Sequence, residues 1–133
     1  MTASRDLEQL LRTLSPVHNP GVYVFASLPT GLAIDMAPVV ASIREAEGLS
    51  VVLAERDALR LGLPIQFRAA WLTLSVHSDL EAVGLTAAVA AALADADISC
   101  NMVAGAFHDH LFVPDEQAEA AMAALARLQQ ATE

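Results

Sequence analysis

Residues 71–77 alternate between apolar and more polar side chains with a period of two. Leu72, Leu74 and Val76 fall on one side, and Trp71 with the intervening residues falls on the other. This alternation, with β-branched and aromatic residues, is typical of a half-buried strand. The pattern therefore predicts a strand over Trp71–His77.

An alanine-rich segment comes after this strand and has the composition of a helix. Ser78 and Glu81 have the spacing of a capping box, in which the serine hydroxyl and the glutamate side chain satisfy each other's backbone amides. We therefore predict a helix from Ser78 to about Ala94. Two further strands are expected at Ile98–Ala104 and His108–Val113.

The N-terminal half shows a related order of patterns. A leucine stripe with helical spacing predicts a leading helix near residues 7–14. Apolar runs predict strands at Val22–Leu28 and Leu49–Leu53, and Glu55–Leu61 reads as a short helix. Pro38 suits the first position of a helix and Gly48 suits its end, so we predict another helix over Val39–Glu47.

The C-terminal segment predicts the last helix, from Asp115 onward. Its apolar residues recur with helical spacing, and the acidic residues at its start suit the positive end of the helix dipole. The expected buried stripe consists of Ala118, Ala121, Met122, Leu125 and Leu128.

Two pairs of predicted strands repeat at nearly constant spacing. Tyr23 and Trp71 begin similar segments 48 residues apart, and Leu49 and Ile98 begin similar segments 49 residues apart. A constant offset across two strands indicates internal duplication. We therefore predict a strand–helix–strand–strand–helix unit present twice, in one compact body of two joined modules.

Composition limits the classes of function. The formal net charge is −9, with only seven Lys plus Arg residues, so nucleic-acid binding and anionic membrane surfaces are disfavoured. The single Cys100 excludes an internal disulfide framework and fits a reducing compartment. Because neither a signal sequence nor a membrane span is apparent, we expect a cytoplasmic protein.

The predicted junction between strand and helix, over residues 76–86, is a candidate anion site. Amides at a helix N-terminus point out of its end, and the helix dipole favours a negative charge there. Gly84 could let a ligand backbone approach closely. The alternative is that Ser78 and Glu81 only satisfy these amides, and that Gly84 only permits close packing.

His108, Asp109 and His110 form a competing candidate. On a strand the two histidines share a face, so they could ligate a metal, with His77 as a third ligand. The alternative, which we favour, is a pair of histidines held by hydrogen bonds at a surface. Cys100 fits a buried apolar position. Because neither a nucleophile elbow nor a glycine-rich phosphate loop is present, we do not expect an enzyme.

Three segments carry a family resemblance. Ser78-Asp-Leu-Glu-Ala-Val-Gly-Leu-Thr, Ile98-Ser-Cys-Asn-Met-Val-Ala-Gly and His108-Asp-His-Leu-Phe-Val-Pro resemble tandem ACT-domain proteins, in particular a small bacterial group of predicted amino-acid-binding proteins. Tyr23-Val-Phe and Glu45-Ala-Glu-Gly-Leu-Ser-Val-Val are similar to that group's N-terminal module. Similar module pairs occur in allosteric aspartate kinases.

The resemblance implies a regulatory or sensing protein that binds an amino acid where two modules meet, without catalysis, metal or cofactor. Carried over to this chain, the ligand-binding residues are His77, Ser78, Asp79, Leu80, Val83, Gly84, Leu85, Thr86, Asn101, Met102 and Val103. The corresponding loop of the first module, Leu28–Ile34, departs from the pattern, so the resemblance does not extend to a second equivalent site.

The expected fold is α+β, with two fused ferredoxin-like modules whose antiparallel sheets carry helices on one face. We place the N-terminal module, with its leading helix, at residues 1–66 and the C-terminal module at residues 67–133. ACT sheets commonly associate, so we expect a homodimer. Any regulated partner would be a separate, unidentified protein. The alternatives are a metal-dependent hydrolase using His108 and His110, and a module that serves assembly alone.

Overall fold

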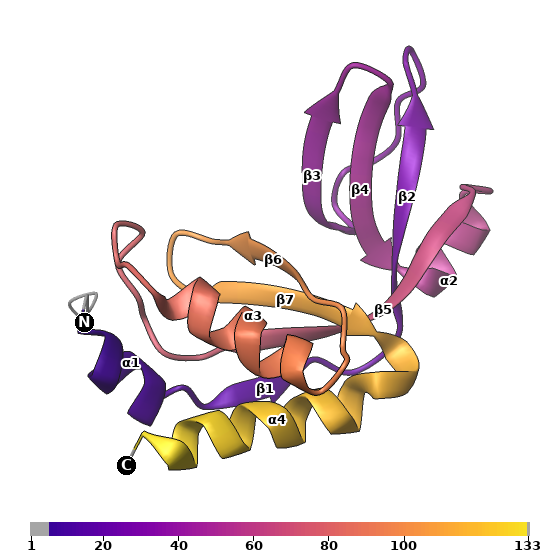
Figure 1. Cartoon of the computed structure of the whole chain (residues 1–133). Helices are drawn as coiled ribbons and strands as arrows, with labels where there is room; N and C mark the ends of the chain where they lie inside the picture. Colours follow the sequence, from indigo (N-terminus) through magenta and orange to yellow (C-terminus); the bar gives the residue numbers. More distant parts are fainter. Residues whose placement is uncertain (1–5, 133) are drawn as a thin grey trace. The chain divides into compact units, whose positions relative to one another are not determined.

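The computed structural model describes residues 6–132, which form two compact units (Figure 1). The C-terminal unit comprises residues 6–20 together with residues 70–132. The inserted unit comprises residues 21–69. The chain therefore leaves the C-terminal unit after its first strand, builds the inserted unit, and returns.

The C-terminal unit is an antiparallel sheet with helices on one face. Its sheet has the order β1-β5-β7-β6, in which β5 enters from the inserted unit. The elements are α1 (Leu7–Arg12), β1 (Pro16–His18), β5 (Ile65–Leu74), α3 (Leu85–Asp95), β6 (Asn101–Ala104), β7 (Asp109–Pro114), the 3-10 turn η1 (Asp115–Gln117) and α4 (Ala118–Ala131).

The core of the C-terminal unit lies between this sheet and its helices. Leu72 and Leu74 of β5 point into it, as do Leu93 of α3 and Leu125 of α4, and all four are fully buried. Each fully buried leucine contributes roughly 1.5–3 kcal/mol relative to an exposed one, so this layer holds the unit together.

The inserted unit is a smaller sheet with a single helix among residues 21–69, all of which are described. Its strands are β2 (Tyr23–Pro29), β3 (Val39–Glu45), β4 (Gly48–Ala54) and the start of β5, in the order β3-β4-β2-β5, and its helix is α2 (Glu55–Arg60). Its core has fewer members: Val24, Ala26, Leu28, Val51, Leu53, Ala58 and Leu63.

The fold class is confirmed, as are the elements that correspond to β2, β4, α2, β7 and α4. The helix predicted over Val39–Glu47 is wrong, because this segment is strand β3, paired along β4. Its β-branched residues favour a strand. Gly48 does not end a helix but comes after a tight hairpin turn, opposite Glu45 and with a φ of 148°.

The junction between strand and helix also differs from the prediction. Strand β5 ends at Leu74, and α3 runs from Leu85 to Asp95, so the predicted helix is confirmed but its predicted start at Ser78 is wrong. The intervening residues form a loop whose side chains bond elsewhere, and Gly84 at its end adopts a left-handed φ of 101°. A capping-box spacing alone therefore did not locate the start of the helix.

The leading helix belongs to the core of the C-terminal unit. Leu10, Leu11 and Leu14 pack with α3 and α4, whereas the sequence pattern placed this helix in the N-terminal module. Strand β1 then pairs with the end of β5, with Val17 opposite Thr73. The N-terminus thus supplies the last strand of the C-terminal unit, a placement that no local pattern encodes.

Candidate functional site

The loop between β5 and α3, residues 75–84, contains most of the predicted ligand-binding residues. Ser78 is buried, and its Oγ donates a hydrogen bond of 3.0 Å to Oδ2 of Asp109, which is also buried. Asp79 Oδ1 accepts from the Glu81 amide at 2.8 Å. Ser78 therefore ties the loop to β7 and does not cap a helix.

Helix α3 begins at the end of this loop without a side-chain cap from any residue that the structure describes. Its N-cap is Gly84, and no acidic residue lies in its first turn. The first hydrogen bond of the helix runs from the Ala88 amide to the Gly84 carbonyl, at 2.9 Å. The amides of Leu85, Thr86 and Ala87 therefore have no acceptor within the helix. Leu85 is buried, whereas Thr86 is exposed. This start can stabilise a carboxylate.

Gly84 itself is explained by packing. A Cβ placed on Gly84 would come within 2.9 Å of Cδ2 of Leu7, on helix α1. The missing side chain therefore makes room for Leu7, and the positive φ is a second reason for a glycine at this position. Of the two interpretations of Gly84, close packing is the one that the contacts support.

The predicted residues of β6 divide between the two faces of the sheet. Met102 packs against the core under the helices. Asn101 pairs with Phe112, and Val103 pairs with His110. Because alternate residues of a strand face opposite sides, Asn101 and Val103 lie on the face away from Met102.

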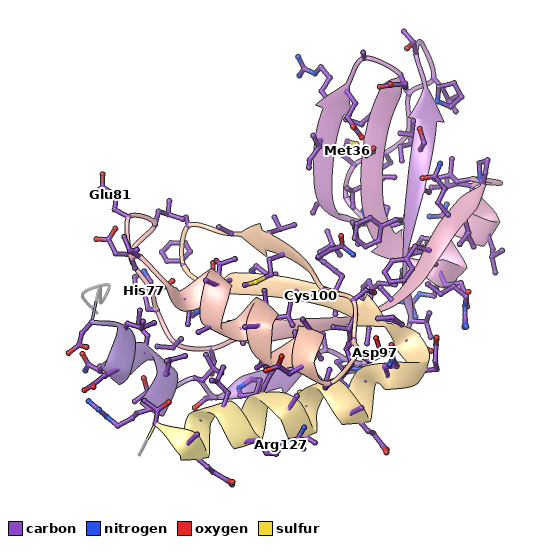
Figure 2. The ribbon with its side chains drawn as sticks, in the orientation of Figure 1. Met36, His77, Glu81, Asp97, Cys100 and Arg127 are labelled. Atoms are coloured by element: carbon purple, nitrogen blue, oxygen red, sulfur yellow. The ribbon has the colours of Figure 1, made fainter. Side chains whose placement is uncertain are left out.

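The structure brings a different segment to the loop. The hairpin between β6 and β7 places Phe107 and His108 beside His77, with ring centroids 5.9 Å and 6.3 Å from it. Figure 2 labels His77 and Glu81 within the loop. Phe107, which is 68% exposed, was missed because an exposed aromatic residue in a hairpin has no periodic signal.

His110 lies in a hydrogen-bonded cluster with Trp71 and Thr73. Trp71 Nε1 donates to His110 Nδ1 at 3.1 Å, and Thr73 Oγ1 lies 3.1 Å from the same atom. Asn19 Nδ2 donates to Thr73 Oγ1 at 2.9 Å. Burial, followed by the nearby His108, lowers the pKa of His110, and the Asp109 charge only partly opposes this. The hydrogen bond that Trp71 donates also requires a neutral His110 ring, because a protonated Nδ1 could not accept it.

Within residues 6–132 the three histidines do not converge as one set of metal ligands. His108 turns to His77, whereas His110 turns to Trp71, and the described residues contain no group of three or more metal-ligating side chains. Cys100 packs against the core of the C-terminal unit, and burial raises the pKa of its thiol to about 11. It is therefore a protonated packing residue at neutral pH.

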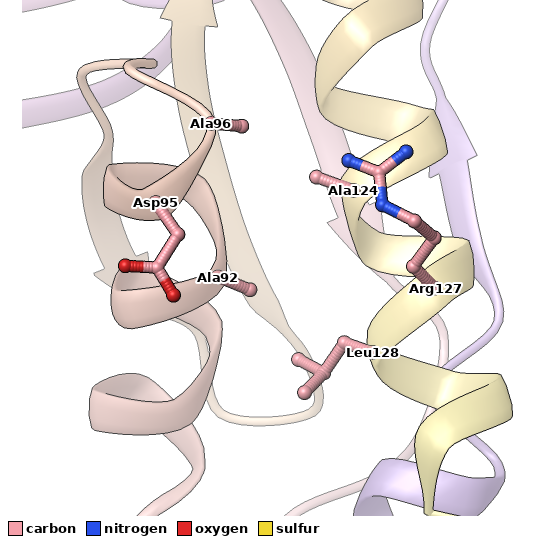
Figure 3. Close-up of a pocket in the computed structure, with 6 residues that line it drawn as sticks. All are labelled: Ala92, Asp95, Ala96, Ala124, Arg127 and Leu128. Carbon is pink, nitrogen blue, oxygen red and sulfur yellow. The ribbon is translucent and has the colours of Figure 1, made fainter.

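Two surface hollows lie outside the predicted site. A groove of about 370 Å³ between α3 and α4 is lined by Ala92, Asp95, Ala96, Ala124, Arg127 and Leu128 (Figure 3). A larger cleft of about 580 Å³ lies in the inserted unit, between the connection after β2 and the hairpin formed by β3 and β4.

Comparison with protein families identifies two ACT domains in tandem. One ACT-domain model matches residues 2–70, and a second matches residues 66–127. The chain belongs to the ACT-domain family. No curated protein sequence matches it.

Solved structures share the fold over most of the chain. A Vibrio cholerae protein of unknown function, described as a possible transport protein, is 42% identical, with a TM-score of 0.82, and the match covers 94% of this chain and 97% of that one. The regulatory subunit of aspartate kinase from Thermus flavus is 12% identical, with a TM-score of 0.58, over 85% and 95% of the two chains. A structure of aspartokinase alpha and beta subunits is 11% identical, with a TM-score of 0.64, over 85% and 95%.

The tandem ACT pair predicted from the sequence is therefore confirmed, and its architecture is that of the regulatory regions of aspartate kinases. Among the described residues, none of the helices is long and apolar enough to cross a membrane.

Proposed function

We propose that this protein binds a free amino acid without transforming it, and that binding regulates a separate protein. The observation that carries the proposal is the uncapped start of α3 in an ACT domain. The ligand carboxylate would accept hydrogen bonds from the amides of Leu85, Thr86 and Ala87. The preceding loop, His77–Gly84, would supply backbone groups to the ammonium. One aspartokinase of the same fold, from E. coli, was solved in complex with aspartate and ADP.

The proposed site has an apolar rim. Leu80, Val83 and Phe107 are 67%, 83% and 68% exposed, on the loop and on the adjoining hairpin. Neighbouring exposed apolar side chains of this size usually mark a surface that another molecule covers. We therefore propose that a second copy of the chain covers this rim in a cytoplasmic homodimer, next to the ligand.

The division into modules at residues 66 and 67 is part of this proposal. The two family matches overlap only at residues 66–70, which supports that boundary along the sequence. The compact C-terminal unit additionally includes the leading helix and β1. We infer that these segments stabilise the C-terminal module, which carries the site.

A thermal-unfolding screen of the free amino acids tests the proposal. A ligand at one hundred times its Kd stabilises the native state by about 2.7 kcal/mol, so a true ligand raises Tm by several degrees. If no amino acid raises Tm at millimolar concentration, the sensing role is excluded.

A pair of variants at Thr86 locates the site. Thr86→Asp adds a carboxylate beside the amides of α3, where it competes with the ligand while stabilising the helix. We expect it to weaken binding about tenfold or more, and we expect Thr86→Asn, its neutral isostere, to change binding less than about threefold. Equal affinity in the two variants would place the ligand elsewhere.

A further inference from the structure

The inserted unit, described throughout, has no counterpart of α3, the helix that packs on the core of the C-terminal unit. In the C-terminal unit, α3 connects β5 to β6 and packs on the core. In the inserted unit, residues 30–38 make the corresponding connection from β2 to β3, and these residues, all described, form neither helix nor strand. Figure 1 shows α3 as a helix and this connection as coil.

The cleft of about 580 Å³ lies where the helix is missing. Its walls come from the connection and from the β3–β4 hairpin. The lining includes Leu32, Met36, Ser42, Arg44, Glu45 and Leu49. Figure 2 labels Met36 beside β3 and β4.

Ser42 and Arg44 lie on the face of the sheet that carries the core. Ser42 is opposite Val51, and Arg44 is opposite Leu49. Directly opposed residues of antiparallel strands share a face. Val51 belongs to the core of the inserted unit, and Leu49 packs against that core. The Arg44 guanidinium and the Ser42 hydroxyl therefore stand beside apolar residues on this face.

Arg44 has no carboxylate partner among the described residues. The arginines 60 and 68 of the same unit are each paired, with Asp57 and Glu55. Glu45, the neighbour of Arg44, instead accepts a hydrogen bond from Ser50. Ser50 is opposite Ile43, so this pair belongs to the other face of the sheet.

We propose that this cleft binds a small organic monocarboxylate with an apolar tail. Arg44 holds the carboxylate in a bidentate pair, assisted by the Ser42 hydroxyl. Leu32, Met36 and Leu49 enclose the tail. Arg44 is the one cation among the described residues of the lining, and Glu45, which also lines the cleft, would repel a second negative charge, so a monoanion is favoured over a dianion. The volume is in the range of small-ligand sites.

Calorimetric titration of the full chain with 4-methylpentanoate tests the proposal. We expect Arg44→Gln to weaken binding at least about tenfold. The matched control is Arg56→Gln, which removes an exposed arginine of α2 outside the cleft and should change Kd less than about twofold. The neutral analogue 4-methylpentanamide should bind the unaltered protein about tenfold more weakly or worse.

A second variant tests the cleft without removing a charge. Ser42 is exposed on an edge strand, so Ser42→Phe should fold, fill the cleft and abolish binding of 4-methylpentanoate, with unfolding measurements to check the fold.

Several outcomes overturn the proposal: no binding by the unaltered chain, equal loss in Arg44→Gln and Arg56→Gln, or unchanged binding in Arg44→Gln. Unchanged binding would leave Arg44 as a charge that merely protects an edge strand. Loss in Thr86→Asp with retention in Arg44→Gln would also overturn it, by assigning the carboxylate to α3. Because the probe lacks an ammonium group, failure here leaves the amino-acid site untouched.

Discussion

The two units are built on the same strand order but differ in the connection after the first strand. In the C-terminal unit this connection is a loop and the helix α3, and the helix closes the core. In the inserted unit the connection has no helix, and a cleft takes the place of the helix. The comparison shows that two units with the same strand order can differ in one connection, which makes their surfaces chemically different.

The difference has a consequence for ligands. The C-terminal unit offers backbone amides at a helix start, which suit the carboxylate of a zwitterion. The inserted unit has one arginine, Arg44, in a cleft that is lined in part by apolar residues, and we propose that it holds a monoanion. The two proposed sites would therefore differ in the groups that hold the anion: backbone amides in the C-terminal unit and an arginine side chain in the inserted unit.

The largest expected effect is on stability, and it compares a buried leucine of α3 with an exposed leucine of α2. Leu93→Ala removes a fully buried side chain from α3, and we expect it to lower the free energy of unfolding by about 2–5 kcal/mol. The same change at Leu59 of α2, which is 65% exposed, should cost less than about 0.5 kcal/mol. Urea unfolding measures both, and equal costs would mean that α3 does not close the core.

The next effect concerns the bond that holds the loop of the C-terminal unit. Ser78→Ala leaves the buried Asp109 carboxylate without its Ser78 donor, and we expect a cost of about 1–3 kcal/mol. Ser75→Ala, in the same loop, removes an exposed bond to the Ser15 carbonyl and should cost about 0.5 kcal/mol. If both variants unfold at the same urea concentration, the Ser78–Asp109 bond does not anchor the loop.

Two glycines, one in each unit, compare the cost of adding a side chain with and without a packed neighbour. Gly84 and Gly31 both have a positive φ, of 101° and 91°, but only Gly84 faces a neighbour, Leu7. Gly84→Ala and Gly31→Ala should each cost about 1 kcal/mol for the backbone, with roughly 1 kcal/mol more at Gly84 for the contact. In a double-mutant cycle, Leu7→Ala should remove this excess. Additive costs in the cycle would mean that Leu7 does not constrain Gly84.

The smallest effect is a pH dependence in the C-terminal unit. The pKa of His110 is lowered in the folded state, so the unfolded chain binds the proton more readily and stability falls as pH drops below about 6.5. Protonation also breaks the hydrogen bond from Trp71. His110→Gln should flatten the decline in unfolding free energy between about pH 7 and pH 5. An unchanged profile would assign the decline to other groups.

The sheet was predictable from local patterns, because apolar runs and alternation identify strands wherever one face is buried. The strands β2, β4 and β7 were found in this way. The segment 39–45 was not, because a proline before it and a glycine after it resemble the boundaries of a helix. Its pairing with β4 decides the outcome, and pairing is a tertiary effect that propensity does not contain.

The site was predictable only in part. The segment containing the loop was identified, but its internal bonds were not, since Ser78 finds its partner 31 residues away in Asp109. Leu7 is still farther along the chain from Gly84. Spacing rules describe neighbours within one element, so they could neither place Ser78 and Gly84 nor assign the first strand to the C-terminal unit.

The central claim is that a free amino acid binds at the start of α3, and amide NMR shifts test it most directly. When the amino acid that stabilises the protein most is added to saturation, the largest shifts should fall on Leu85, Thr86 and Ala87, with Gly31 in the inserted unit unmoved. Thr86→Asp should raise the ligand concentration at half-maximal shift at least about tenfold, and Thr86→Asn should change it less than about threefold. If every amino acid leaves these three amides unshifted, the claim is contradicted.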